Sequence, residues 1–266
     1  MGFPADYHMH TPLCRHATGD PVVLAARAVD LGLTEIGFSD HNPMPQDNFD
    51  TWRMPLADLD EYVRRVELAR SMFPGLTIKL AMEVDFLPGC EGWVRDLAGR
   101  YPWDYFIGSV HYVSRSFAID DPGQIGQWRS RDPMEIWTAY FDRLTMAAGS
   151  GLFEIIGHTD LCKKFCFYPR EDYLPLVAKF LEAARKHDVA IELNTAGLRK
   201  DCKEIYPSQK IVELAGKIGV PITFGSDAHA PEEVGMNFNE AVASARDAGY
   251  TQWCSFTQRK RHLVAL

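Results

Sequence analysis

Short apolar runs that alternate with helical patterns constrain the fold of this chain more than any other feature of its sequence. The runs are rich in β-branched or aromatic residues, and the strands they predict end within residues 7–10, 35–40, 78–83, 105–109, 153–157, 189–193 and 221–225. Strands that alternate with helices form βα units around a parallel sheet. We therefore expect an α/β fold, in which residues 1–266 form a single barrel-like domain.

The helical patterns fill the segments between these strands. Asp20-Pro21 is a typical start and Gly32 a typical end of a helix, and Pro74-Gly75 stops the next pattern. The predicted helices cover residues 21–31, 56–72, 173–186 and 208–217, with one more inside 231–248. Residues 114–131, which contain Asp120-Asp121-Pro122-Gly123, lack a regular pattern and are expected to form a long loop over one end of the fold.

Composition and charge exclude several classes of protein. The net charge of −8 argues against a broad basic face that binds nucleic acid, although bound cations can make one pocket positive. No apolar run approaches the roughly 20 residues of a membrane span, and the first residues do not resemble a signal peptide. The six cysteines form no C-x-x-C pair, so reduced thiols are expected. These features predict a cytoplasmic protein that has no nucleic-acid or membrane partner, and they are compatible with a small anionic substrate.

Histidines accumulate where the predicted strands end. Of the nine in the chain, seven lie at or just after these positions: His8, His10, His16, His41, His111, His158 and His229. Ligands gather at the carboxyl ends of parallel strands, so these side chains should converge. The alternative is that each histidine only caps a strand end through backbone hydrogen bonds, which is a reasonable explanation for one histidine but not for seven.

The spacing of these residues adds a chemical argument. His8 and His10 are two residues apart on a strand and point to the same side, and Asp227 and His229 repeat the spacing. The third strand offers Glu83 or Asp85 as a carboxylate ligand. Imidazole and carboxylate ligands without thiolate suit Zn, Fe or Mn, and their number would serve about two or three ions. Asp40 and Asp160 are expected either to orient the rings of His41 and His158 or simply to cap the strand ends.

Four motifs then resemble the PHP (polymerase and histidinol phosphatase) family. They are His8-Met9-His10-Thr11 with His16 beyond it, Ser39-Asp40-His41-Asn42, the pair Gly108-Ser109-Val110-His111 and Gly157-His158-Thr159-Asp160, and Gly225-Ser226-Asp227-Ala228-His229. Within this family the chain is most similar to stand-alone histidinol-phosphate phosphatases, on residues 54–62, 83–86, 107–113 and 192–199. The resemblance implies a distorted (β/α)7 barrel, similar to a TIM barrel, with a metal site at the carboxyl ends of its strands.

The resemblance also implies which residues bind metal. His8, His10, Glu83 and Asp227 would hold a first ion, and Glu83 would bridge to a second ion that His111 and His158 complete. His16, His41 and His229 would hold a third. Where the family has a glycine before the glutamate, this chain has Met82. The choice of Glu83 over Asp85 therefore depends on its position in the strand.

The implied activity is hydrolysis of L-histidinol phosphate to L-histidinol and phosphate, a step of histidine biosynthesis. A hydroxide shared by two ions would attack phosphorus. Arg199 is the first candidate to bind the phosphate because a guanidinium can hold two oxygens, and Lys163, Lys164 and Asn194 are further candidates. A water on the third ion, His229 or Asp160 would supply the proton to the leaving group.

The organic part of the substrate would be recognised by loops at the mouth of the barrel. Phe49 and Trp52 in residues 42–53, or the aromatic residues of 117–128, could stack on its imidazole. Its amine would meet a carboxylate among Asp47, Asp50, Asp120 and Asp121.

Three alternatives fit parts of this pattern. A PHP-type phosphoesterase or nuclease acting on nucleotides or oligonucleotides would keep every metal ligand and differ in its loops. A non-catalytic metal-binding interaction module would have lost ligands, and none is missing here. A metal-dependent amidohydrolase shares the H-x-H motif, but His16 and the late Asp-x-His favour the PHP family.

Overall fold

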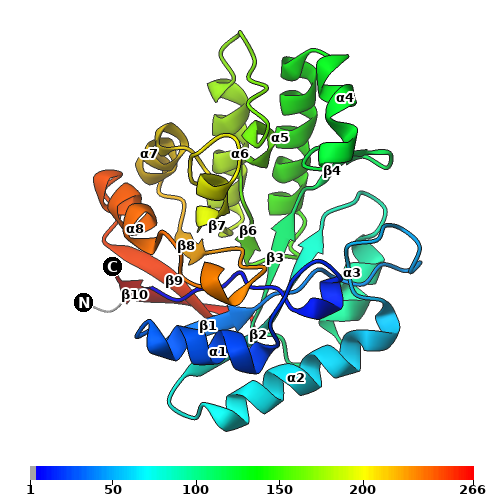
Figure 1. The fold of residues 1–266 in the computed structure, drawn as a ribbon. Coiled ribbons are helices and arrows are strands. Elements are labelled where there is room, and N and C mark those ends of the chain that lie inside the picture. Colours follow the sequence, from blue (N-terminus) through cyan, green and yellow to red (C-terminus); the bar gives the residue numbers. More distant parts are fainter. Residues whose placement is uncertain (1–3) are drawn as a thin grey trace.

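The computed structural model describes residues 4–266 and contains a curled, parallel sheet at its centre (Figure 1). Its six strands follow one another in chain order, and every neighbouring pair is parallel. They are β1 (Glu35–Phe38), β2 (Thr77–Asp85), β3 (Tyr105–Ser109), β6 (Ile155–Ile156), β7 (Ala190–Asn194) and β8 (Ile222–Gly225). The sequence analysis expected a strand at each of these places.

The N-terminal segment joins the two edges of this sheet. Residue Asp6 forms a parallel bridge with Ile36 of β1, and Met9 forms one with Ala228, just after β8. On the β8 side, the backbone N–H of Tyr7 donates to the carbonyl of Phe224 at 3.1 Å. The segment thus takes the place of a seventh strand and completes a distorted (β/α)7 barrel, although its pairing is limited to single bridges.

Helices surround the sheet (Figure 1). The long ones are α1 (Pro21–Asp30), α2 (Leu59–Met72), α3 (Glu91–Ala98), α5 (Pro133–Gly149), α6 (Leu174–Lys186), α7 (Gln209–Ile218) and α8 (Phe238–Asp247). Short 3-10 helices lie mostly in the connections, at η1 (Pro12–Cys14), η2 (Leu56–Asp58), η3 (Pro122–Gln124), η4 (Leu161–Lys163), η5 (Thr195–Arg199) and η6 (Pro231–Glu233). The turns η1, η4, η5 and η6 follow strand ends or the N-terminal segment and carry or flank the expected site residues.

Residues 114–131 are more ordered in secondary structure than a long loop. They contain β5 (Phe117–Ala118), which pairs with β4 (Tyr112–Ser114), as well as η3 and the short helix α4 (Ile125–Arg129). The rings of Phe117 and Trp128 are buried and lie 6.0 Å apart. The expectation that these two rings contact a substrate is therefore wrong, because they pack in the core.

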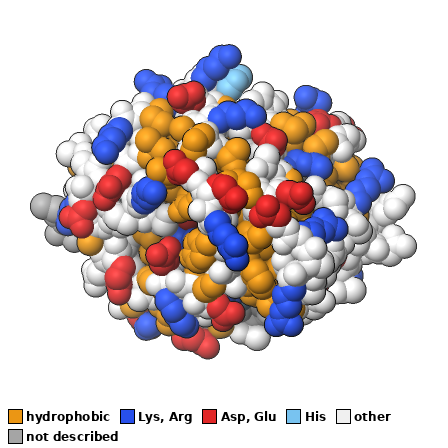
Figure 2. All heavy atoms as spheres, turned by 90° about the horizontal axis from the view of Figure 1, so that it is seen from above, with side chains coloured by type: hydrophobic (Ala, Val, Ile, Leu, Met, Phe, Trp, Pro, Cys, Tyr) orange, Lys and Arg blue, Asp and Glu red, His pale blue; other side chains and the backbone are white. Residues whose placement is uncertain are grey.

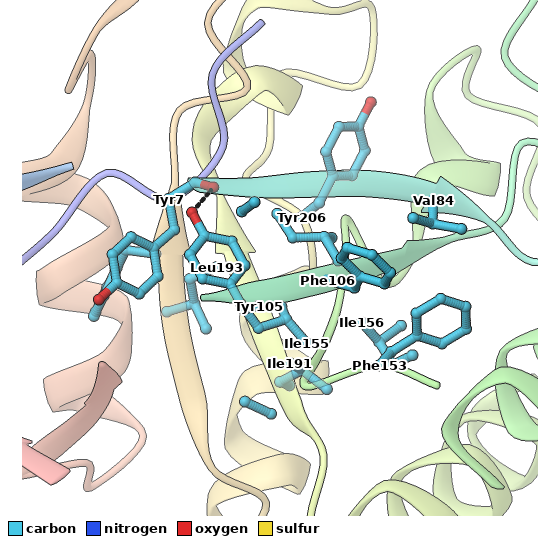
Figure 3. Packing of buried hydrophobic residues seen from close by; sticks show 14 of the residues in the cluster. Tyr7, Val84, Tyr105, Phe106, Phe153, Ile155, Ile156, Ile191, Leu193 and Tyr206 are labelled. Atoms are coloured by element: carbon cyan, nitrogen blue, oxygen red, sulfur yellow. Dashed lines mark hydrogen bonds between the residues drawn. The ribbon is translucent and has the colours of Figure 1, made fainter. Parts of the chain in front are cut away.

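The hydrophobic core fills the space enclosed by the curled sheet and the space between the sheet and the surrounding helices. Figure 3 shows Tyr7, Tyr105, Phe106, Ile155 and Ile191 packed together, and the hydroxyl of Tyr105 donates to the carbonyl of Tyr7 at 2.7 Å. This bond fixes the N-terminal segment to β3, so the position of the following histidines is set by a buried aromatic residue. At the other end of the chain, the hairpin of β9 (Gln252–Thr257) and β10 (Lys260–Ala265) places Trp253 against Tyr7, at 6.0 Å.

The surface carries both signs of charge. On the face shown in Figure 2, lysine and arginine side chains alternate with aspartate and glutamate, and no broad basic area forms on that face. No helix within residues 4–266 has the length and hydropathy needed to cross a lipid bilayer.

Candidate metal centre

Glu83 lies at the centre of the histidine cluster. It sits near the carboxyl end of β2, is 1% exposed, and its two carboxylate oxygens face five imidazoles. Nδ1 of His41 lies 2.8 Å and Nε2 of His158 lies 2.9 Å from this carboxylate. The other three imidazole nitrogens are at 3.4 to 3.6 Å, from His8, His10 and His111. The geometry therefore favours Glu83 as the carboxylate shared by the site.

Asp85, the other carboxylate of β2, has a different set of partners. Its oxygens accept hydrogen bonds from Nη2 of Arg53 at 2.7 Å and contact Nδ1 of His111 at 2.9 Å. Asp85 thus holds the far side of an imidazole whose Nε2 points towards Glu83. Carboxylates in this position orient a ligating histidine and increase its basicity.

The remaining candidate ligands join the same cluster. Atoms that could bind an ion lie within 4.8 Å of one another in three sets: His8, His10 and Asp227; Glu83, His111 and His158; and His10, His41 and His229. His16 is adjacent, with its Nε2 2.9 Å from Nε2 of His229. The structure thus brings together all nine residues proposed as ligands. Cys14, a buried cysteine that the sequence analysis did not propose as a ligand, belongs to two further sets, one with His16 and His229.

The environment of these groups fits divalent cations. Nε2 of His8 and Oε2 of Glu83 are buried and have no hydrogen-bond partner among the described residues. Burial opposes ionisation of Glu83, but the charges of neighbouring histidines, first His41, lower its pKa well below the usual range. Burial and neighbouring cationic histidines together lower the pKa of His41 to about 4, despite the opposing charge of Glu83. Buried polar atoms that converge without partners are costly unless a cation satisfies them.

Two acidic residues fix the cluster from outside. Glu192 on β7 contacts Nδ1 of His8 at 2.7 Å and accepts a hydrogen bond from the backbone N–H of His158 at 2.9 Å. Asp40 contacts Nδ1 of His10 at 3.4 Å and accepts from the backbone N–H of His41 at 2.9 Å. Of the two alternatives for Asp40, orientation of the ring of His41 is wrong, since its ring contact is with His10, and the bond from the backbone N–H of His41 fits capping of the strand end.

Glu192 was missed by the sequence analysis. Its signal was an acidic residue inside the apolar run Val189-Ala190-Ile191-Glu192-Leu193, where a buried charge needs a partner. The space next to it is tight: a Cβ on Gly225 would lie 2.1 Å from Oε1 of Glu192 and 2.6 Å from Cβ of His8. Glycine at the end of β8 therefore allows Glu192 to reach His8.

A cavity of about 430 Å³ opens above the cluster. Its floor is made by His16, His41, Glu83, His111, His158, Asp227 and His229, and its walls include Trp52, Asp120, Asp121, Lys164, Lys200, Tyr206 and Glu233. Of the proposed substrate residues, Lys164 lines this cavity, and its Nζ lies 3.2 Å from the carboxylate of Asp120.

Lys163 and Asp160 face away from this cavity. Nζ of Lys163 donates to the carbonyl of Ile205 at 2.7 Å and pairs with Asp160 at 3.0 Å, and both residues line a separate cavity. Asp160 also accepts from the backbone N–H of Ser208 and makes no contact with the ring of His158. The structure thus does not bring these two residues to the phosphate side, because the turn η4 directs successive lysines to opposite sides.

Arg199 and Asn194 lie beside Asp227. Nη2 of Arg199 donates to the carbonyls of Ser226 and Asp227 at 2.8 and 3.2 Å, while Nη1 is buried and has no hydrogen-bond partner among residues 4–266. Asn194 is buried, and its amide donates to Glu192 at 3.0 Å and to Asp227 at 3.4 Å.

Comparison with known proteins agrees with this geometry. The family described as "PHP domain" matches residues 6–196, and "PHP-associated" matches residues 207–247. A Deinococcus radiodurans protein named "Probable histidinol-phosphatase" is 42% identical over 92% of this chain and 93% of its own length. The "Histidinol-phosphatase" of Bacillus subtilis is 28% identical over 88% of this chain and 96% of its own.

A solved structure has the same fold over nearly all of the chain. It is histidinol phosphate phosphatase of Lactococcus lactis complexed with zinc, L-histidinol and phosphate, with a TM-score of 0.85 and 19% identity, covering 98% of this chain and 100% of the other. The residues matched by the two family descriptions include the strands and connections that carry the histidine cluster. The chain belongs to the PHP domain family.

Proposed function

We propose that this protein is a phosphoric monoester hydrolase that converts L-histidinol phosphate to L-histidinol and phosphate. The observation that carries the proposal is a buried cluster of nitrogen and oxygen ligands that forms the floor of one small cavity. Relatives that match nearly the whole chain are named for this activity. The Lactococcus lactis structure, which shares the fold, contains zinc and both reaction products.

Two to three divalent ions per chain, of Zn, Fe or Mn, would be held by the nine clustered residues. These are His8, His10, His16, His41, Glu83, His111, His158, Asp227 and His229. Such ions, when bound, lower the pKa of water and neutralise the charge on a phosphoryl group. The donor set favours borderline cations over calcium or magnesium, since imidazole nitrogens outnumber carboxylates.

The other residues of the site bind and orient the ester. Arg199 is not among the lining residues of the cavity, but its Nη2 donates to the backbone of Asp227 and its Nη1 has no partner among the described residues. These contacts support a guanidinium that binds a phosphate oxygen at the edge of the cluster. Lys164 adds a second positive charge from the cavity wall. Asn194 holds Asp227 and Glu192 in place, which supports a positioning role rather than direct phosphate binding.

Neither His229 nor Asp160 has the charge state or the orientation to donate a proton to the leaving group. Burial and the nearby His10 lower the pKa of His229 well below its usual value, so its imidazole is neutral near pH 7. Asp160 is turned towards Lys163 and Ser208. We therefore propose that Asp160 supports the turn η4, and that the proton comes from water in the cavity.

The test is a comparison of substrates with the metal-loaded enzyme. We expect L-histidinol phosphate to exceed p-nitrophenyl phosphate and nucleoside monophosphates by at least ~100-fold in kcat/KM, because the site must recognise a remote amine and ring. Equal or faster turnover of nucleotides or oligonucleotides would favour the PHP-type nuclease alternative. Full activity after exhaustive chelation, with no metal detectable, would exclude the metal centre.

A further inference from the structure

Carboxylates on the cavity walls differ in how many of their oxygens are already occupied. Five line the cavity: Glu83, Asp120, Asp121, Asp227 and Glu233. Glu83 and Asp227 face the histidines. In Glu233, Oε2 accepts from the backbone N–H of His229 at 2.8 Å and Oε1 pairs with Nε of Arg199 at 3.1 Å. The oxygens of these three carboxylates therefore already face imidazoles, Asn194, Arg199 or a backbone N–H.

The two neighbouring aspartates are directed differently. Oδ1 of Asp121 accepts from the backbone N–H of Gly123 at 2.8 Å and caps η3, and no cation holds the other oxygen of Asp121 among the described residues. In Asp120, Oδ2 pairs with Nζ of Lys164 at 3.2 Å, and Oδ1 has no hydrogen-bond partner among the described residues. The side chain of Asp120 is 25% exposed, which leaves Oδ1 open to a ligand.

The position of Asp120 is fixed from two sides. Nζ of Lys164 donates to its backbone carbonyl at 2.6 Å as well as to its carboxylate. The preceding residue, Ile119, is buried, and its carbonyl accepts from Nε1 of Trp128 at 2.8 Å. A charged group held in this way loses little conformational entropy when it binds a ligand.

Asp120 also lines the same cavity as the candidate metal ligands His111 and His158. Burial opposes its ionisation, but Lys164 and then His111 lower the pKa of the carboxyl below its usual value, and His158 contributes in the same direction. Asp120 is therefore an anion close to two of the candidate metal ligands. In L-histidinol phosphate the carbon that carries the amine is bonded directly to the ester CH₂. An amine on that carbon must therefore lie near the wall next to the bound phosphate.

We propose that Asp120 binds the cationic amine of the substrate through its free Oδ1, and that it selects vicinal amino phosphate monoesters over other monoesters. The inference rests on the proposed function. It assigns to one residue a recognition that the sequence left open among four carboxylates. Asp50 is occupied by Arg53 at 2.8 Å, and Asp47 accepts from the backbone N–H of Leu56 at 3.1 Å. Lys164 acts as a positioning residue that keeps Oδ2 engaged and Oδ1 free.

The experiment uses two substrates that differ only in the amine: L-histidinol phosphate and 3-(imidazol-4-yl)propyl phosphate. In the metal-loaded wild type, we expect kcat/KM to be at least about tenfold higher for the amine-bearing ester, the value of a charge-assisted hydrogen bond. Asp120→Asn should lower kcat/KM for that ester by about 10- to 100-fold and change the amine-free ester by less than about threefold. Asp142→Asn, on α5 in an exposed pair with Lys179, is the matched control and should alter neither value strongly.

The outcomes separate this inference from the proposed function. A wild type that hydrolyses neither imidazole ester would overturn the proposed function. A wild type that hydrolyses both equally would overturn the role of Asp120 alone, and this result does not depend on whether a variant folds. An equal loss on both esters in Asp120→Asn, with unchanged metal content, would make Asp120 a structural residue and would also refute the proposal.

Discussion

Glu83 and Asp85 lie two residues apart on β2, and this spacing points both carboxylates to the same side of the sheet. Their partners nevertheless differ, because Arg53 reaches Asp85 while Glu83 meets only histidines. A strand position alone could not separate them, since the guanidinium comes from a loop 32 residues earlier. At the scale of single residues, the partner on the outside of the cluster decides which acid is free to bind an ion.

Arg199 gives the first prediction at this scale. Arg199→Ala should leave the metal content unchanged, because no atom of Arg199 belongs to the candidate ligand sets. The value of kcat for L-histidinol phosphate should fall about 10²- to 10³-fold, as when one preorganised donor to a transition state is removed. Arg185→Ala, on the exposed part of α6, is the control. Wild-type turnover by Arg199→Ala would remove Arg199 from the phosphate site.

Proton release on metal binding is the second prediction. Burial opposes protonation of His10 and His111, yet hydrogen bonds from His10 to Asp227 and the charge of Asp85 near His111 raise their pKa values to about 9 and about 10. Both are therefore protonated near pH 7 without metal and must lose a proton to bind an ion. His41, with a pKa of about 4, is already neutral and releases none.

The raised pKa values of these histidines determine how metal affinity changes with pH. Burial opposes protonation of His8 too, but the charges of Glu192, Asp227 and Glu83 raise its pKa well above the usual value. The logarithm of the apparent affinity should increase with pH between about 7 and 9, with at least about two protons released per chain on full loading. Titration calorimetry of zinc into the chelated protein, in two buffers of different ionisation enthalpy, measures this number. Binding that releases no protons at pH 7 would show that these imidazoles are neutral before the metal binds.

At the scale of secondary-structure elements, the sequence predicted the strands of the sheet and most of the helices between them, but not α3 and α5. The strands of the sheet were found because each is an apolar run that ends in polar residues. Helix α3 was missed, and only Val94 and Leu97 are buried in it, so its apolar pattern is short. Helix α5 was missed although Ile136, Tyr140, Phe141 and Leu144 are spaced as in a helix after Asp132-Pro133, a signal that was available.

The residues of the candidate site were likewise predicted only in part. The nine candidate ligands could be named because they lie at equivalent strand ends, whereas Glu192 contacts His8 across 184 positions of sequence. Lys163 and Lys164 are adjacent in sequence but face different cavities, which only the path of η4 determines. The organisation of residues 1–266 as one domain and a cytoplasmic location stay predictions.

The segment of residues 42–54 supplies the element-scale prediction. Arg53 is 4% exposed; it pairs with Asp50 and Asp85 and its guanidinium lies 4.3 Å from the ring of Trp52. Arg53→Ala would remove the guanidinium shared by the buried Asp50 and Asp85, leaving His111 as the cation beside Asp85, and should lower the free energy of unfolding by about 3 kcal/mol. Urea unfolding of the metal-free protein measures the loss. Arg64→Ala, which removes an exposed pair with Glu61, should change stability little.

At the scale of the whole molecule, the histidine cluster links parts of the chain that are distant in sequence. Its members come from the N-terminal segment, β2 and the connections that follow β1, β3, β6 and β8. An ion bound there would hold the two edges of the sheet together at the point where the N-terminal segment forms only single bridges. Metal binding should therefore stabilise the closed barrel as a unit and not one local loop.

This linkage can be measured by chelation. A ligand at 100 times its Kd stabilises the folded state by about 2.7 kcal/mol, and 1 kcal/mol corresponds to about 2–4 °C in a domain of roughly this size. Removing the metal should therefore lower Tm by at least about 5 °C, and adding zinc back should restore it. In His41→Ala this difference should shrink because a candidate ligand is lost, whereas His187→Ala, an exposed histidine at the end of α6, should keep it. Equal Tm values for the metal-loaded and chelated wild type, despite measured loss of metal, would show that the ions do not contribute to closing the barrel.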